Sequence, residues 1–402
     1  MNALPLTANK ADDASISDAT LSSSGAVQDR ALYARVRKRL PAEDHEFALD
    51  IDFSAEPGFT ILFGPSGAGK TTLLDCLAGL VVPDEGRVTV GARVLFDAAG
   101  QVNLPVAKRR VGYVLQDLAL FPHLTVAQNI QYGLVHLPRG ERGERAAAIM
   151  NAFHIQHLAA RYARHISGGE RQRVALARTL VTDPTVLLLD EPLVALDAAT
   201  KSRILNDLRT WNEAHRIPIL YVTHSRDEVF ALGARALVLD HGRILAQGTP
   251  HAVLDAPRQE TVAQLAGFEN IFDVTVESLH ADRGTMVCQI APGDVTAGKG
   301  ANGIQLETPL VRAEVGSPLR VGIRAGDILL SIVPPLGLSA RNLIAGRLIS
   351  LEQRDVIITA CVDCGVEMEV HLTLAARDAL QLAPGRMVWL VIKTHSCYLM
   401  QS

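Results

Sequence analysis

The sequence contains no long apolar run, and its cysteines are few and scattered. Although 48% of its 402 residues are hydrophobic, apolar runs such as Thr185 to Leu189 are only strand-length, far shorter than the roughly 20 residues of a membrane-spanning helix. The five cysteines are odd in number, which argues against the disulfide framework of a small secreted protein. We therefore expect a chain that does not cross a bilayer by itself and that folds in a reducing compartment.

The chain also lacks a strong excess of charge of either sign. Its formal net charge is −4 at pH 7, without the basic surplus typical of nucleic-acid binders, so nucleic acid is not an expected partner. The N-terminus has neither a basic start nor a continuous apolar stretch, and no signal peptide is predicted. Residues 1–30 are rich in Ser, Ala and Asp and poor in large apolar side chains, which predicts a disordered tail.

The remaining chain is long enough for more than one domain. From about Phe47, short apolar strands alternate with helical segments, which predicts an α/β domain with a largely parallel sheet. We place this domain at residues 31–267, with a more helical subdomain at about 117–170. Short β-type runs then recur between glycines, and they predict an all-β domain of the OB-like barrel kind over residues 268–402, made of two related barrels.

One glycine-rich segment has the phosphate-loop pattern and lies between a predicted strand and a predicted helix. Its glycines allow backbone N–H groups to turn inward around phosphates, and the helix N-terminus adds partial positive charge. Lys70 is expected to neutralise the β- and γ-phosphate oxygens, and Thr71 to ligate Mg²⁺. ATP and Mg²⁺ are thus the expected ligands. The predicted nucleotide-binding residues of this loop are Gly64, Pro65, Ser66, Gly67, Ala68, Gly69, Lys70, Thr71 and Thr72.

Two carboxylates end a second apolar strand, in the run VLLLDEP from Val186 to Pro192. Ligands collect at the carboxyl ends of strands in open parallel sheets, so both side chains are expected beside the phosphate loop. Asp190 is predicted to hold Mg²⁺, and Glu191 to act as the base that polarises the water attacking the γ-phosphate.

Between these two motifs, the run ISGGERQR from Ile166 to Arg173 is similar to the signature sequence of the ABC ATPase family. A serine and two glycines that open a helix form a second anion-binding helix N-terminus. The resemblance implies that Ser167, Gly168 and Gly169 face the nucleotide bound to the other subunit of a homodimer. ATP binding would then close the dimer.

Three further positions match this family residue by residue. By resemblance, Gln116 in YVLQD senses Mg²⁺ or the attacking water and signals to a permease. Asp197 lies at the dimer interface, and His224 in YVTHS contacts the γ-phosphate. Gln116 and His224 thus join Glu191 as expected catalytic residues, and Gln116 also joins the expected Mg²⁺ ligands.

The residue that stacks on adenine is the least defined part of the predicted site. Members of this family usually carry an aromatic residue for this purpose upstream of the phosphate loop. An ungapped comparison places Pro41 there, and Phe47 and Tyr33 are the alternatives.

The family resemblance covers about residues 31–400 and is closest to ATP-binding subunits of importers. Near the end, SARNL and LVIKTHS resemble the small molybdate-binding β domain of molybdate importer ATPases. Hydroxyl, backbone N–H and cationic groups there would hold a tetrahedral dianion, and molybdate is the expected regulatory ligand. An alternative is a β domain that only buttresses the dimer. The predicted oxyanion residues are Ser339, Arg341, Lys393 and Thr394.

These patterns together predict the ATP-hydrolysing subunit of an ABC importer for molybdate, an ATPase coupled to transport. The resemblance implies two integral-membrane permease subunits, an indirectly acting periplasmic or extracellular solute-binding protein, and a bacterial location at the cytoplasmic face of the cell membrane. Two alternatives stay open. One is an importer ATPase for sulfate, ferric iron or a polyamine, and the other is a soluble ABC ATPase without a permease. A pure oxyanion-binding module disagrees with the presence of Lys70, Asp190 and Glu191.

Overall fold

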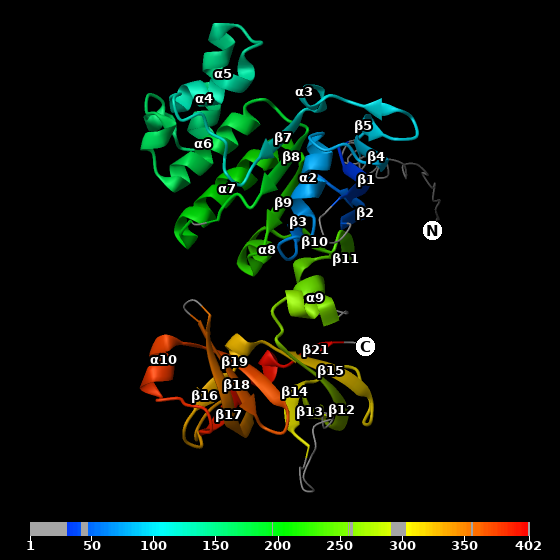
Figure 1. Cartoon of the computed structure of the whole chain (residues 1–402), viewed down its shortest axis with the longest axis vertical. Helices are drawn as coiled ribbons and strands as arrows, with labels where there is room; N and C mark the ends of the chain where they lie inside the picture. The colour runs from blue at the N-terminus through cyan, green and yellow to red at the C-terminus, as the bar shows by residue number, and fades with distance from the viewer. Residues whose placement is uncertain are drawn as a thin grey trace, which may run out of the picture. The chain divides into compact units, whose positions relative to one another are not determined.

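The computed structural model describes residues 30–41, 47–194, 196–255, 257, 260–290, 303–354 and 357–400. The tail predicted at residues 1–30 lies outside this part of the chain except for Arg30. The chain divides into two compact units, Met1–Leu245 and Ala246–Ser402 (Figure 1). Domain limits at residues 31–267 and 268–402 stay predictions. Within the described ranges, no helix is long and apolar enough to span a membrane.

A largely parallel six-stranded sheet forms the centre of the first unit. Its strand order is β11-β10-β3-β9-β8-β7, and the five strands from β10 to β7 pair in parallel. The strands are β3 (Gly58–Phe63), β7 (Val111–Val114), β8 (Val186–Asp190), β9 (Pro218–Thr223), β10 (Arg235–Asp240) and β11 (Arg243–Gly248). β8 and β9 are buried along their whole length, as expected for continuous apolar runs with both faces covered. The carboxyl ends of the parallel strands therefore meet at one edge.

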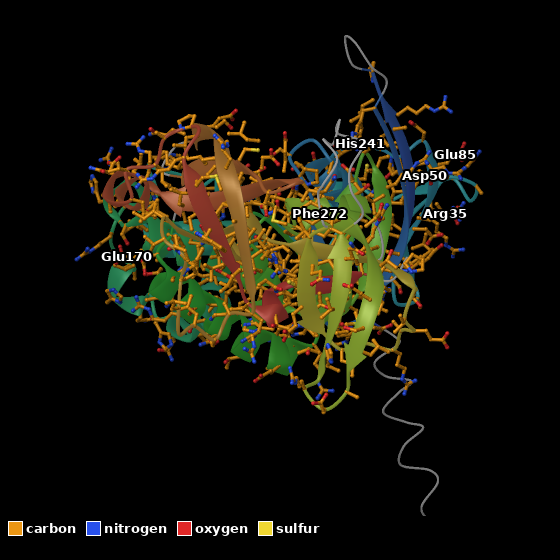
Figure 2. The ribbon with its side chains drawn as sticks, turned by 90° about the horizontal axis from the view of Figure 1, so that it is seen from below. Arg35, Asp50, Glu85, Glu170, His241 and Phe272 are labelled. Carbon is orange, nitrogen blue, oxygen red and sulfur yellow. The ribbon has the colours of Figure 1, made fainter. Side chains whose placement is uncertain are left out.

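A second sheet in the first unit is antiparallel, with the order β2-β1-β4-β5-β6. Its strands are β1 (Leu32–Leu40), β2 (Phe47–Ala55), β4 (Glu85–Val90), β5 (Arg93–Asp97) and β6 (Val102–Asn103). Alternate residues of β1 are buried, and they share one apolar core with helix α2 (Lys70–Ala78) and the parallel sheet. The opposite face is polar: Figure 2 shows Arg35, Asp50 and Glu85 on it, and Arg37 bonds to both Asp50 and Glu85 at 3.1 Å.

The first unit also contains helices. They are α3 (Val106–Arg109), α4 (Val126–Gln131), α5 (Arg139–Ala152), α6 (Gly168–Leu180), α7 (Ala198–His215) and α8 (Arg226–Leu232), with 3-10 turns at Tyr132–Leu134, Gln156–Leu158 and Ala163–His165. α4, α5 and α6 contact one another, and α4 and α5 stand away from the parallel strands (Figure 1). This helical group holds most of the stretch that the sequence marks as more helical.

The second unit begins with two helical segments and continues as two five-stranded antiparallel sheets. These helical segments are a π-helix at His251–Asp255 and α9 (Glu260–Leu265), and a further short helix, α10 (Leu374–Ala379), follows β19. One sheet has the order β14-β13-β12-β15-β21, and the other β16-β20-β17-β18-β19. The strands are β12 (Asn270–His280), β13 (Thr285–Ile290), β14 (Gln305–Pro309), β15 (Pro318–Ile323), β16 (Leu329–Ser331), β17 (Asn342–Arg354), β18 (Ile357–Asp363), β19 (Glu367–Thr373), β20 (Met387–Ile392) and β21 (Tyr398–Met400). The prediction of a C-terminal region built from strands is confirmed, with α10 as an added short helix.

The two sheets repeat one strand pattern. In each, a long first strand pairs with the second and fourth strands of its own repeat, and the third strand pairs with the second. A register shift also interrupts β12 and β17 at equivalent places, between Val276 and Ser278 and between Leu348 and Ser350. The fifth strands are exchanged, because β16 follows the first repeat but pairs with β20, whereas β21 follows the second repeat but pairs with β15.

Candidate nucleotide site

The predicted phosphate loop follows β3 and leads directly into α2. Gly64 packs so closely on β10 that an added Cβ would lie 2.0 Å from the carbonyl oxygen of Leu239. Gly69 has a φ of +100° and caps α2 without a side chain. Glycine is therefore needed at both positions. The first N–H groups of α2 have no intrahelical acceptors, so they are available to an anion held by the loop.

Lys70 is the first residue of α2, and its side chain lies back along the loop. Its ammonium group donates to the carbonyl oxygens of Gly64 at 2.9 Å and Pro65 at 2.7 Å. The residue is only 7% exposed. Burial lowers the pKa of Lys70, and the carboxylates of Glu191 and Asp190 act in the opposite direction. A buried ammonium group beside a glycine-rich loop is suited to bind phosphate oxygens.

Asp190 ends β8 and faces the start of α2. Thr71 Oγ1 donates a hydrogen bond to Asp190 Oδ2 at 2.9 Å. Burial raises the pKa of Asp190, while the hydrogen bond from Thr71 lowers it. A hydroxyl oxygen and a carboxylate oxygen at this distance are the hard donors that Mg²⁺ prefers, so these residues fit Mg²⁺.

Glu191 lies at a strained turn directly after β8. Its φ is +45°, in the left-handed region that residues with side chains seldom occupy. Its N–H donates to the carbonyl oxygen of Val222 on the neighbouring strand β9, at 3.2 Å. Glu191 Oε1 also lies 3.4 Å from Nδ1 of His224, which directly follows β9. Adjacent strands thus bring the predicted base and the predicted phosphate-contacting histidine together.

One cleft of about 420 Å³ collects the exposed part of the loop and the carboxylates. It is lined by Leu40, Phe47, Ser66, Gly67, Gly69, Lys70, Thr71, Thr72, Gln116, Asp190 and Glu191. Of the aromatic candidates, Phe47 lines this cleft, and a Cβ at Gly69 would lie 2.7 Å from its ring. Neither Tyr33 nor Pro41 is among the described residues that line it. The other predicted loop residues do not line this cleft: Gly64 and Ala68 are buried, and Pro65 is half-buried.

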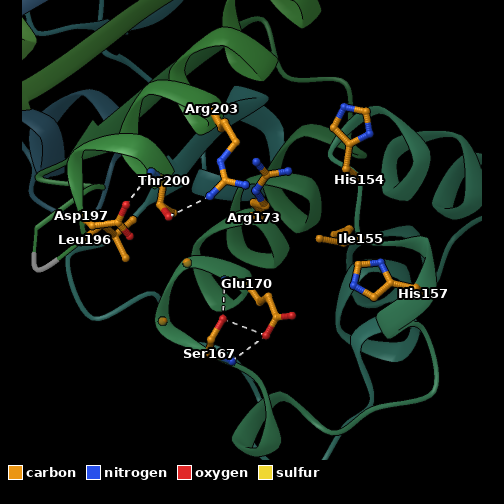
Figure 3. Close-up of a pocket in the computed structure, with 12 residues that line it drawn as sticks. His154, Ile155, His157, Ser167, Glu170, Arg173, Leu196, Asp197, Thr200 and Arg203 are labelled. Atoms are coloured by element: carbon orange, nitrogen blue, oxygen red, sulfur yellow. Dashed lines mark hydrogen bonds between the residues drawn. The ribbon is translucent and has the colours of Figure 1, made fainter.

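The residues of the signature sequence line a different cleft, of about 630 Å³ (Figure 3). Its walls are His154, Ile155, His157, Ser167, Gly168, Gly169, Glu170, Arg173, Leu196, Asp197, Thr200 and Arg203. Of the described residues that line it, none belongs to the phosphate loop. A single chain therefore divides the predicted nucleotide-binding residues between two clefts, with Asp197 beside the signature residues.

Hydrogen bonds fix the two helix starts in this second cleft (Figure 3). Glu170 Oε2 accepts from the backbone N–H of Ser167 at 2.7 Å and from its hydroxyl at 2.8 Å. These bonds hold the pKa of Glu170 below its usual value. At the start of α7, Asp197 Oδ1 accepts from the N–H of Thr200 at 2.9 Å, and hydrogen bonding to Thr200 lowers the pKa of Asp197. Both helix N-termini are thus capped by side chains.

Tyr113 is a site residue that the sequence analysis missed. It lies on β7, and burial raises its pKa, with a further contribution from the carboxylates of Asp75 and Asp190. Its place on the strand that leads to Gln116 is the only signal in the sequence. A second missed feature is an ion pair behind His224, between Lys201 and Glu228.

The four predicted oxyanion residues lie at one end of a sheet in the second unit. Asn342 and Ile392 are the terminal pair of β17 and β20. Arg341 directly precedes this pair and Lys393 directly follows it, and both side chains are exposed. Ser339 lies just before Arg341, and Thr394 begins a 3-10 turn. Strand pairing therefore brings together two segments that are far apart in the sequence.

Comparisons with known proteins match both units. The ABC transporter family profile matches residues 49–194, and the TOBE domain profile matches residues 338–399. The chain is 39% identical over 357 residues to the molybdenum import ATP-binding protein ModC of Rhizobium meliloti (strain 1021), covering 87% of this chain and 95% of that relative. It is 36% identical over 349 residues to the molybdate/tungstate import ATP-binding protein WtpC of Pyrococcus abyssi (strain GE5 / Orsay), covering 86% of this chain and 93% of that relative.

Among solved structures, the chain is similar to cbiO1 of Clostridium perfringens, described as part of the ABC transporter complex cbiONQ. The identity is 29% and the TM-score 0.50, over 56% of this chain and 90% of the other. These matches confirm the predicted resemblance and the predicted fold.

Proposed function

Because this chain belongs to the family of ABC transporter ATP-binding proteins, we propose that it is the ATP-hydrolysing subunit of a molybdate importer. The observation that supports hydrolysis most directly is the grouping of Lys70, Thr71, Asp190 and Glu191 in one cleft, with His224 beside Glu191. Together they supply phosphate binding, metal binding and a base. The names of the relatives support molybdate as the cargo.

The chemistry follows from where these groups lie. The Lys70 ammonium group and the N–H groups of the loop hold the β- and γ-phosphates. Glu191 accepts a proton from the attacking water, and His224 donates to the γ-phosphate while its ring lies against the Glu191 carboxylate. Thr71, Asp190 and Gln116 would hold Mg²⁺, whose contribution is to neutralise charge on the phosphate oxygens.

The division of the site between two clefts supports a homodimer. Ser167, Gly168, Gly169 and Asp197 of one protomer would meet the nucleotide held by the phosphate loop of its partner. Each ATP then contacts both protomers, so nucleotide binding drives closure. Phe47, which lines the cleft beside Gly69, is the residue that we propose to stack on adenine.

Transport requires further subunits. We place this protein at the cytoplasmic face of a bacterial membrane, beneath two integral-membrane permease subunits, with a solute-binding protein delivering the cargo from outside. In the second unit, Ser339, Arg341, Lys393 and Thr394 would bind molybdate as a regulatory ligand, because hydroxyls and cations at one sheet end suit a tetrahedral dianion.

Hydrolysis is tested with Glu191→Gln, which keeps the side-chain shape and removes the base. Turnover should fall by on the order of a hundredfold or more, while ATP binding persists and ATP drives the variant into a stable dimer in size-exclusion chromatography. Glu213→Gln, an exposed change on α7, is the matched control and should hydrolyse ATP like the wild type. Undiminished turnover in Glu191→Gln would refute the assigned base, and an inactive wild type would refute the ATPase.

The cargo is tested by calorimetric titration of the full chain with molybdate, tungstate and sulfate. Selective binding of molybdate and tungstate, lost in Arg341→Ala and Lys393→Ala, would support a molybdate importer with its own sensor. Binding of sulfate with equal affinity would favour another cargo. No binding at all would reduce the second unit to a structural role and leave the oxyanion residues without support.

A further inference from the structure

A buried carboxylate lies behind the histidine of the site, and the hydrolysis chemistry described above does not use it. Glu228 is on the first turn of α8, shortly after His224, and is only 7% exposed. A buried carboxylate is costly unless several donors surround it. The hydrogen-bond partners of Glu228 come from two elements, β9 and α7.

One carboxylate oxygen of Glu228 accepts hydrogen bonds from side chains at the end of β9. Oε2 accepts from the Tyr221 hydroxyl at 2.9 Å and from the Thr223 hydroxyl at 2.8 Å. Thr223 Oγ1 in turn accepts from the N–H of Ser225 at 3.0 Å. His224 lies between Thr223 and Ser225, so its backbone is fixed on both sides by hydrogen bonds that converge on Glu228.

The other carboxylate oxygen forms an ion pair with a lysine of α7. Glu228 Oε1 accepts from Lys201 Nζ at 2.9 Å, and the Lys201 side chain is 27% exposed. Lys201 is on the first turn of α7, and its N–H donates to the carbonyl oxygen of Asp197 at 3.0 Å. The segment from Glu191 to Asp197 thus ends at the turn that Lys201 anchors.

We propose that the Lys201–Glu228 ion pair is a positioning device for ATP hydrolysis. It holds the turn that carries His224 against the helix start that carries Asp197, and so keeps His224 in place beside Glu191. Lys201 and Glu228 are positioning residues, because neither lies in the cleft that holds the loop and the carboxylates. This inference rests on the proposed ATPase function.

The positioning role of the ion pair is tested by two substitutions that keep the length of the side chain and remove its charge. Glu228→Gln would remove the negative charge and leave a single acceptor oxygen, so that either Lys201 or the hydroxyls of β9 lose their acceptor. Lys201→Met would leave Oε1 without its cation. Each should lower kcat by about ten- to a hundredfold with the KM for ATP changed less than threefold, because the phosphate loop is untouched. Lys201→Arg, which can still donate to Oε1, should recover most of kcat.

A double variant tests whether a neutral hydrogen bond at this place can replace the charged ion pair. In Lys201→Gln/Glu228→Gln, two amides can form a neutral hydrogen bond at the same place, so its kcat should exceed that of Glu228→Gln alone. Lys38→Met is the matched control, since it removes another lysine ion pair, with Asp84 at 2.7 Å, and should leave kcat within twofold of the wild type.

The outcomes distinguish this inference from the proposed function. The positioning role is overturned if the wild type hydrolyses ATP and the Lys201 and Glu228 variants have the same kcat. It is also overturned if kcat falls and the KM for ATP rises together, in proportion to a loss of thermal stability. If the wild type itself has no ATPase activity, the proposed function fails first. A selective loss of kcat with recovery in Lys201→Arg supports the positioning role.

Discussion

The charged residues around the phosphate loop lie in surroundings that disfavour their charge. Burial raises the pKa of Asp190 and lowers the pKa of Lys70. Because the pKa of Asp190 is higher in the folded chain than its ordinary value of 3.8, the folded chain binds a proton there more readily than the unfolded chain does. The ionised carboxylate therefore lowers the free energy of unfolding at neutral pH, and this loss disappears as the pH falls through the raised pKa.

Asp190→Asn should remove this electrostatic cost while keeping an oxygen that accepts the Thr71 hydroxyl. We expect the metal-free variant to unfold at a higher temperature than the wild type at pH 7.5, with a difference that shrinks as the pH falls through the raised pKa of Asp190. Its ATPase activity should fall by on the order of a hundredfold. Thermal unfolding over a pH series measures the first effect, and a variant less stable than the wild type at pH 7.5 would contradict it.

At the level of elements, one buried arginine anchors the C-terminal end of α2. Arg109 is fully buried, and its guanidinium group makes four hydrogen bonds of 2.8 to 2.9 Å. The acceptors are the carbonyl oxygens of Cys76, Leu77 and Leu104 and the side-chain oxygen of Asn103. The last carbonyls of a helix lack intrahelical partners and attract positive charge. Arg109 thus fixes the helix whose other end carries Lys70 and Thr71.

Arg109→Leu should lower the free energy of unfolding by about 3–5 kcal/mol, because it leaves buried carbonyl groups of α2 without donors. Urea unfolding of the full chain measures the loss. Arg35→Leu is the control, since Arg35 forms an exposed ion pair with Asp52 at 3.1 Å and should cost about 1 kcal/mol or less. Equal losses in the two variants would show that Arg109 is no more important than a surface arginine.

The sequence predicts the strands that carry the site better than it predicts the buried side-chain contacts that hold those elements in place. β3, β8 and β9 are continuous apolar runs next to recognisable motifs, so both the strands and the positions of Gly64, Asp190 and His224 follow from local patterns. Arg109 and Lys201, by contrast, look like solvated charges in the sequence. Lys201 bonds to Glu228, 27 residues away, and Arg109 bonds to the end of α2, 32 and 33 residues away, and no local period reveals such partners.

The division of the site between two clefts also lies beyond local patterns. The order of motifs along the chain does not say whether Ser167 faces the phosphate loop of its own protomer, and only the resemblance to a family implied that it does not. Among the candidates for adenine, Phe47 lines the cleft and Tyr33 does not, because strand pairing sets Tyr33 opposite Ser54, away from the loop. Such facts depend on register and on three-dimensional packing.

At the level of the whole molecule, the second unit consists of two repeats that stabilise each other. Asn270 and Asn342 begin the first strands of their repeats and are 3% and 4% exposed. The Asn270 amide donates to the carbonyl oxygen of Glu369 at 2.8 Å and accepts from its N–H at 2.7 Å. Asn342 does the same with Glu307, at 3.0 and 2.7 Å. Each asparagine side chain thus makes a pair of hydrogen bonds to the backbone of a strand in the other repeat, as a neighbouring strand would.

Asn270→Ala and Asn342→Ala should each destabilise the second unit by about 2–4 kcal/mol, because each removes two hydrogen bonds to backbone groups. Hydrogen exchange across β14 and β19 provides the measurement, and protection at Glu307 or Glu369 should fall most. Gln289→Ala, an exposed change on β13, should stay within about 0.5 kcal/mol of the wild type. If protection falls only in the repeat that carries the substitution, the two repeats are not coupled in this way.

The exchanged strands also bear on how this unit came to exist. A gene encoding one repeat alone would give a polypeptide whose last strand cannot complete its own sheet, since β16 and β21 each pair with the fourth strand of the other repeat. Two copies of that ancestor would complete each other by reciprocal strand exchange. Duplication and fusion would then have turned an obligate pair into one chain, with residues 332–341 as the seam between the former partners.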